Sequence, residues 1–187
     1  PNPPTAHQAA RHETDFILGS LDLQAAVGLG RLWTLELGLP LRLIDSTARF
    51  FDAGDAEMSG FESIHHRNEV LTGIGDISAT SRLRVVGADG GAILVDVTAG
   101  VFLPTGHTEP DPFVLGASGQ AHQHMFFGNG TFDPQVGAQA VWSAGEYRTS
   151  GYGYARLPLS ENSHGFRGPR LWAAGVAVDR SVGTPQF

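Results

Sequence analysis

Apolar and polar side chains alternate along most of this chain with a period of two, which is the period of a β-strand. In residues 93–103, Ile93, Val95 and Val97 share one face, and Asp96 and Thr98 share the other. Residues 131–142 repeat this pattern after a long connection that contains histidines and glycines. An apolar face opposite a polar face over about ten residues is typical of a membrane-spanning β-strand.

The same alternation extends over the rest of the chain and predicts seven strands. They cover residues 17–29, 33–43, 76–85, 93–103, 131–142, 147–159 and 172–179. Residues 1–14 show no periodicity and predict an irregular arm before one β-domain over residues 15–187. Short connections (28–31, 87–91, 143–146) alternate with long ones (45–72, 104–130, 160–169), as they do in outer-membrane barrels.

Most charges in the predicted strands lie on the face opposite the apolar one. A basic side chain that faces lipid at mid-depth costs about 2–4 kcal/mol, so this placement indicates a lumen-facing side. The candidate lumen-lining residues are Asp76, Arg82, Arg84, Asp96, Asp133, Arg148 and Arg156. They would either line a selective pore or form the salt-bridged interior of a narrow barrel.

The strand count indicates that the barrel extends beyond these strands. Bacterial single-chain barrels have even numbers of strands, and seven cannot close by antiparallel pairing. We therefore expect part of a larger, even-stranded barrel, completed by further strands or by a second chain or oligomer.

Three tryptophans fit the same interpretation. We expect Trp33, Trp142 and Trp172 near the short-turn ends of their strands. Aromatic residues at that level form the interfacial girdle of membrane barrels.

Composition narrows the classes of partner. The formal charge is −7, with 12 basic residues, all of them arginine, against 19 acidic ones. Nucleic-acid binding requires a clustered basic surface, so this balance argues against a nucleic-acid partner. The chain has 0 cysteines, which excludes a disulfide framework.

Short glycine-rich motifs open or close several predicted strands. They read GIGD at 73–76, LPTG at 103–106, GNGTFDP at 128–134 and RLPLSEN at 156–162. In their order and spacing, over roughly residues 70–180, these motifs resemble the outer-membrane β-barrel family named for the meta-pathway of phenol degradation. The resemblance implies a membrane barrel, and members of that family are often labelled as transporters.

The histidines all lie in the arm or in the long connections, and therefore at one rim of the predicted barrel. They are His7, His12, His65, His66, His107, His122, His124 and His164. In an extended segment, His122 and His124 place both imidazoles on one side, which is the start of a divalent metal site.

Acidic residues near these histidines are candidates to complete such a site. They are Glu62, Glu69, Glu109 and Asp111. The spacing matches no standard zinc signature, and in the alternative interpretation the histidines are simply polar residues tolerated in wet loops. No other cofactor is expected.

Taken together, the pattern predicts an all-β protein, an antiparallel transmembrane up-and-down barrel in the outer membrane of a Gram-negative bacterium. Its partner is the lipid bilayer, and its function is that of a passive channel or porin-like transporter for small solutes, apolar ones included. Catalysis is not expected, since Ser81 and Ser143 have no histidine on a neighbouring predicted strand.

Two alternatives remain open at this point. The first is a structural or interaction barrel whose histidine- and acid-rich extracellular rim docks a partner or binds a metal. The second is a soluble β-sandwich binding module, whose strands also alternate but turn the apolar face inward.

Overall fold

The protein is all-β, as the alternation predicts. The computed structural model describes residues 9–61, 63–87, 91–122 and 124–181. The strands are β1 (Arg11–Leu29), β2 (Trp33–Phe51), β3 (Glu69–Ile74), β4 (Ser78–Val86), β5 (Ile93–Phe102), β6 (Asp133–Ala144), β7 (Tyr147–Arg156) and β8 (Leu171–Arg180), with one short helix, α1 (Pro112–Ala117). Within these described ranges, no helix is long and apolar enough to cross a membrane.

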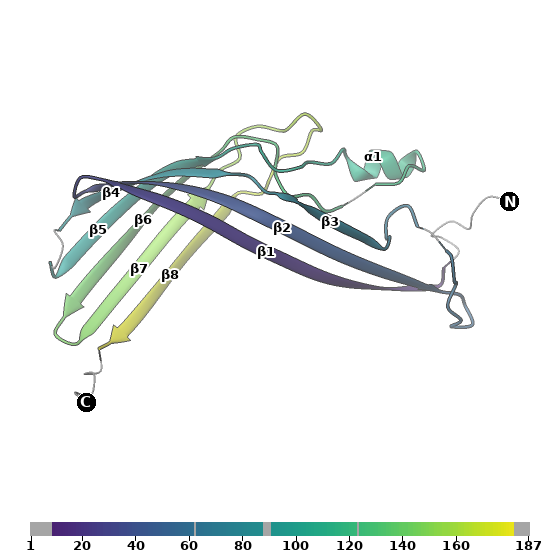
Figure 1. Cartoon of the computed structure of the whole chain (residues 1–187), viewed down its shortest axis with the longest axis horizontal. Coiled ribbons are helices and arrows are strands. Elements are labelled where there is room, and N and C mark those ends of the chain that lie inside the picture. The colour runs from purple at the N-terminus through teal and green to yellow at the C-terminus, as the bar shows by residue number, and fades with distance from the viewer. Residues whose placement is uncertain (1–8, 62, 88–90, 123, 182–187) are drawn as a thin grey trace.

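The strands form one curled antiparallel sheet with up-and-down connections (Figure 1). The order is β1-β2-β4-β5-β6-β7-β8, so each strand on this path pairs with its neighbours in sequence. The short connections lie at one end of the sheet, and the long ones, together with α1, lie at the other. The alternation of short and long connections is therefore confirmed, although residues 88–90 of the turn predicted at 87–91 lie outside the described residues.

The sheet is open, and β1 and β8 are its two edges. Strand β3 begins within residues 45–72, which the sequence predicted to be a loop, and extends to Ile74. It pairs with β2 at residues 41–46, next to the 33–38 segment of β2 that pairs with β4. β3 and β4 pair with successive segments of the same edge of β2. β3 is therefore a continuation of β4 and does not count as a separate strand in the order of the sheet.

The break between β3 and β4 has a local cause at Pro40. Proline has no N–H to donate to a neighbouring strand, so it interrupts a ladder. Gly75 N donates to the carbonyl of Pro40 over 2.8 Å. A Cβ at Gly75 would lie 2.9 Å from Pro40 Cγ, which explains the glycine at this close approach.

The two faces of the sheet differ in curvature as well as in polarity. On the polar face, side chains from strands that are not neighbours meet, as Gln135 of β6 does with Thr80 of β4 over 2.6 Å. Arg156 of β7 likewise lies over the ring of Phe102 in β5, 3.9 Å from its centroid. Contacts between strands that are not neighbours, about 9.6 Å apart, are favoured on the concave side of a curled sheet, where side chains converge. The polar face is therefore concave and the apolar face convex.

The convex face exposes its apolar side chains. Val97 is 38% exposed, and Val176 on β8 is 80% exposed. The larger set of exposed apolar residues on this face includes Ile17, Leu21, Leu23, Val27, Leu35, Leu37, Leu83, Ile93, Val136 and Val178. No second layer covers this face in the part of the chain that the structure describes.

Two strands are longer than the sequence predicts. β1 begins at Arg11, inside the expected irregular arm, and β2 continues to Phe51, well past the predicted end at residue 43. Beyond the apolar stretch, the convex face of this two-stranded ribbon becomes charged. Arg49 there pairs with Glu13 over 3.1 Å.

The expected position of one tryptophan is wrong. Trp33 and Trp142 lie near short turns, but Trp172 is the second residue of β8 and lies at the end of the sheet that bears the long connections. The three exposed indoles are therefore divided between the two ends of the sheet.

Candidate functional site

A buried ion cluster joins the concave face to the long connections. Asp133 is completely buried at the start of β6, and Arg156 Nη2 at the end of β7 lies 2.6 Å from its Oδ2. The same guanidinium nitrogen lies 3.1 Å from Asp76 Oδ2. Asn129 also binds both carboxylates, through its backbone N–H to Asp76 and its side-chain amide to Asp133. One arginine is thus shared by two buried aspartates, whose other hydrogen bonds come from neutral N–H groups and from the hydroxyl of Thr131.

The glycine-rich motifs converge on this cluster. Gly106 N donates to Asp76 over 3.2 Å, and a Cβ at Gly106 would lie 2.6 Å from Gly128 Cα. Thr105 Oγ1 donates to the carbonyl of Gly75 and accepts from Ile77 N. The motifs that carried the family resemblance therefore hold three connections together at one end of the sheet.

The other predicted lumen residues form separate pairs along the concave face. Arg84 lies 2.8 Å from Asp96, which also accepts from Gln139 over 3.1 Å. Arg82 pairs with Glu36 of β2.

Arg148 does not join these pairs. It is exposed at the opposite end of the sheet, beside Asp179 in register. Of the seven candidates, three share the buried cluster, three take part in pairs along the face, and Arg148 lies apart. Glu36 and Gln139 were missing from the candidate set, although their place on the polar face of predicted strands was a signal for them.

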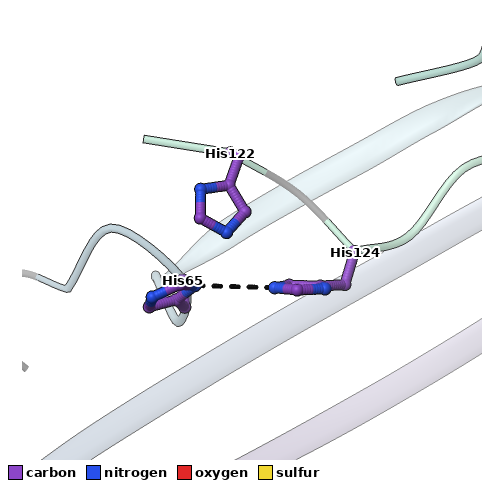
Figure 2. Close-up of side chains that lie close together, drawn as sticks. All are labelled: His65, His122 and His124. Atoms are coloured by element: carbon purple, nitrogen blue, oxygen red, sulfur yellow. Dashed lines mark hydrogen bonds between the residues drawn. The ribbon is translucent and has the colours of Figure 1, made fainter. Parts of the chain in front are cut away.

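A second cluster consists of three histidines from two long connections (Figure 2). His65 precedes β3, and His122 and His124 follow α1. One nitrogen from each ring lies within 4.8 Å of the others, and His65 Nδ1 is 3.5 Å from His124 Nε2. His122 stands edge-on to His65, with ring centroids 4.4 Å apart. The expected pair is therefore present, and a histidine from a distant segment completes the triad.

The backbone of both segments supports this arrangement. Ser63 is buried, and its hydroxyl accepts from the backbone N–H groups of His65 and His66. His122 N donates to the carbonyl of Ile64 over 3.1 Å, which ties the two segments together.

The acids that the sequence proposed as further ligands have other roles. Asp111 caps α1 by accepting from Phe113 N, and Glu109 lies 2.8 Å from the ring of His107. Glu69 pairs with Arg67 over 3.1 Å. Glu62, like His7, lies outside the described residues.

His124 also lines a cavity of about 340 Å³ next to the triad. The cavity lies between the connection that carries α1 and the connection before β8. Its wall includes the aromatic side chains of Phe113, Phe126 and Phe166 and two acidic residues, Glu109 and Asp111. The triad therefore borders a space that a small molecule could enter.

His66 extends the cluster toward β1. Its ring stacks on His12 with centroids 4.8 Å apart. Partial burial lowers the pKa of His66 below the usual 6.5, and the neighbouring His12 and His124 lower this pKa further. Both effects disfavour the protonated form of His66.

Comparisons with known proteins leave the family open: no family model, curated protein or solved structure matches this chain. The resemblance to the phenol-degradation barrel family therefore stays a prediction.

The first prediction concerns the shared arginine. Arg156→Met should lower the free energy of unfolding by about 3–5 kcal/mol, because two buried aspartates lose their cation. Urea titration in detergent would measure this loss. Arg167→Met is the matched control, because Arg167 and Glu161 are exposed and 3.9 Å apart, and it should cost at most about 1 kcal/mol. Equal losses in the two variants would contradict the central role of Arg156.

The second prediction concerns pH. Because the pKa of His66 is lower in the folded chain, the unfolded chain binds the proton more readily, and stability should fall as pH drops through about 6.5. The loss should level off below the folded-state pKa. Urea titrations at pH 8 and pH 5 should show a smaller loss for His66→Gln than for the unsubstituted chain, and the exposed control His164→Gln should keep the full loss. An unchanged loss in His66→Gln would refute this assignment.

Proposed function

We propose that this sheet is part of an outer-membrane β-barrel, with its convex face toward lipid and its concave face toward a lumen. In this proposal the barrel is a passive channel or transporter for small solutes. The observation that carries it is the inverted distribution of polarity. Charged side chains are buried on the concave face, whereas large apolar side chains are exposed on the convex face.

The inversion is extensive. Among the described residues, the buried apolar side chains are few: Phe50, Ala155 and the ring of Pro158. The buried polar ones are Ser46, Ser63, Asp76, Asp96, His122, Thr131 and Asp133. Water-soluble monomers rarely expose continuous apolar patches larger than a few hundred Å², and this patch runs across the whole sheet. Lipid is the solvent for which such a surface is stable.

The dimensions of the sheet support a membrane location. β4 has 9 residues, β5, β7 and β8 have 10 each, and β6 has 12. A strand tilted by about 45° needs roughly 9–11 residues to cross the hydrocarbon core. Exposed tryptophans at both ends of the sheet are what two interfacial girdles require.

Closing this open sheet into an antiparallel barrel restricts how many further strands can lie between β1 and β8. β1 and β8 run in the same direction, because an odd number of antiparallel positions separates the two edges. Pairing β1 directly with β8 would therefore be parallel. An odd number of additional strands between them restores antiparallel pairing throughout, and the proposal leaves open which polypeptide supplies them.

The pairing of charges supports a lumen for solutes of low charge. Arg84 with Asp96, and Arg82 with Glu36, neutralise each other along the concave face. Such a wall is polar but has little net charge in this region, so it does not exclude neutral solutes.

The third prediction tests which face meets lipid, with two neighbouring positions of β6. Ala138 lies on the convex face, whereas Gln139 lies on the concave face 3.1 Å from Asp96. Ala138→Arg should cost about 2–4 kcal/mol of folding into lipid vesicles. Gln139→Arg should fold normally, because the new guanidinium meets the Asp96 carboxylate. Folding yield into vesicles, followed by protease protection, would measure both.

Two results would overturn the assignment of faces. One is a normal yield for Ala138→Arg together with a failure of Gln139→Arg. The other is a chain that stays monodisperse in buffer without detergent, which would favour the soluble sandwich.

The fourth prediction tests transport itself. Planar bilayers containing the assembled protein should show conductance. Glu36→Gln leaves Arg82 without its carboxylate and should shift the selectivity toward anions, whereas Arg82→Gln should shift it toward cations. The absence of conductance for the unsubstituted protein would rule out an ion-permeable channel, and shifts in the same direction would show that this pair does not face the pore.

A further inference from the structure

We propose that His65, His122 and His124 form a binding site for a divalent first-row transition-metal ion, with Zn²⁺ as the best-matched ion. The site is built from two long connections, so it does not depend on the membrane-spanning part of the proposed function. Its ligands would be three neutral imidazole nitrogens.

The first observation that points to a bound metal ion is the tautomer of His122 and its buried, unpartnered Nε2. His122 is only 4% exposed, and its Nδ1 lies 2.8 Å from the carbonyl oxygen of Gln120. A carbonyl oxygen can only accept, so Nδ1 carries the proton and Nε2 keeps a lone pair. Nε2 is buried and has no hydrogen-bond partner within the described ranges. A buried acceptor without a partner is costly, and a metal ion would use this lone pair.

This arrangement is also the one that metal-binding histidines adopt. Such a histidine usually donates its second ring N–H to a carboxylate or a backbone carbonyl, which fixes the tautomer and the orientation of the ring. The carbonyl of Gln120 performs this role for His122.

The spacing of the three rings requires only a small adjustment. Zn–N bonds of about 2.0–2.1 Å in a tetrahedron place the ligand nitrogens roughly 3.3 Å apart. His65 Nδ1 and His124 Nε2 are 3.5 Å apart, and all three candidate ligand atoms lie within 4.8 Å of one another. The rings face a common space from two sides, as Figure 2 shows. A contraction of up to about 1.5 Å between the ligand nitrogens would complete the geometry.

The surrounding chain packs closely against the other two rings. α1 packs against them through Gly116, where a Cβ would lie 3.0 Å from His122 Cε1 and 3.3 Å from His65 Cε1. Glycine at this position lets the helix approach the rings closely. A supported set of imidazoles is the second observation in favour of a built site.

The chemistry of the ligands selects the class of metal. Imidazole suits Zn²⁺, Cu²⁺ and Ni²⁺, whereas Ca²⁺ and Mg²⁺ require oxygen ligands. Three protein ligands leave one tetrahedral position of Zn²⁺ for water or a small molecule. Because His124 also lines the aromatic cavity, this position would be next to that space.

The test is calorimetric titration of the full chain in detergent with ZnCl₂, after treatment with a chelator and without a polyhistidine tag. We expect one Zn²⁺ per chain at pH 7.5 and weaker binding at pH 5.5, since the imidazoles must be neutral to bind. His122→Asn keeps a side-chain N–H for Gln120 but removes the ligand nitrogen. It should weaken binding at least tenfold, as should His124→Ala at an exposed position.

The matched controls are His107→Asn and His164→Asn, which remove histidines outside the triad from the same end of the molecule and should leave the affinity unchanged. The proposal is overturned if the unsubstituted chain binds no Zn²⁺ at micromolar concentration, or if the control variants weaken binding as much as His122→Asn. If His122→Asn does not fold, an affinity unchanged by His124→Ala overturns it as well. Circular dichroism of each variant would establish that it is folded.

Discussion

The shared arginine at the end of β7 is the interaction on which the arrangement of the concave face depends. Arg156 reaches from β7 to Asp133 on β6 and to Asp76 before β4, so it ties together strands that are not neighbours. Two buried aspartates without that cation would repel each other at low dielectric. Asp76 also accepts backbone N–H groups from the long connections, and Asp133 accepts the side-chain amide of Asn129 and the hydroxyl of Thr131. The same three charges thus join β6, β7 and the segment before β4 to the long connections.

The strands were predictable because alternation is a local property. Wherever one face meets an apolar environment and the other a polar one, the sequence has a period of two, and β4, β5 and β6 follow that pattern closely. The prediction failed where the environment changes along a strand. Before Ile17 in β1 and after Leu43 in β2, the convex face of the ribbon becomes charged. The alternation that identified these strands therefore stops there, although backbone pairing continues to Arg11 and Phe51.

Of the candidate metal site, only the pair His122 and His124 could be predicted from the sequence. Two histidines separated by one residue could be recognised as a pair, because an extended backbone places both on one side. The third ring comes from the connection before β3, and the two segments meet only in the folded chain, where His122 N donates to the carbonyl of Ile64. Acids chosen for their nearness in sequence were poor candidates, because Asp111 and Glu69 serve a helix cap and an ion pair close to their own positions.

The length of the β1–β2 ribbon determines how far its histidines would lie from the charged surface of a membrane. If lipid covers the apolar stretch that ends at Leu43, the strand continues for eight more residues to Phe51, which at about 3.4 Å each and a tilt of about 45° is roughly 19 Å. The Debye length at physiological ionic strength is about 8 Å. The far end of this ribbon would therefore lie beyond the reach of the headgroup charge. Histidines held there, such as His12 against His66, would respond to the pH and ion content of the bulk medium rather than to those of the membrane surface.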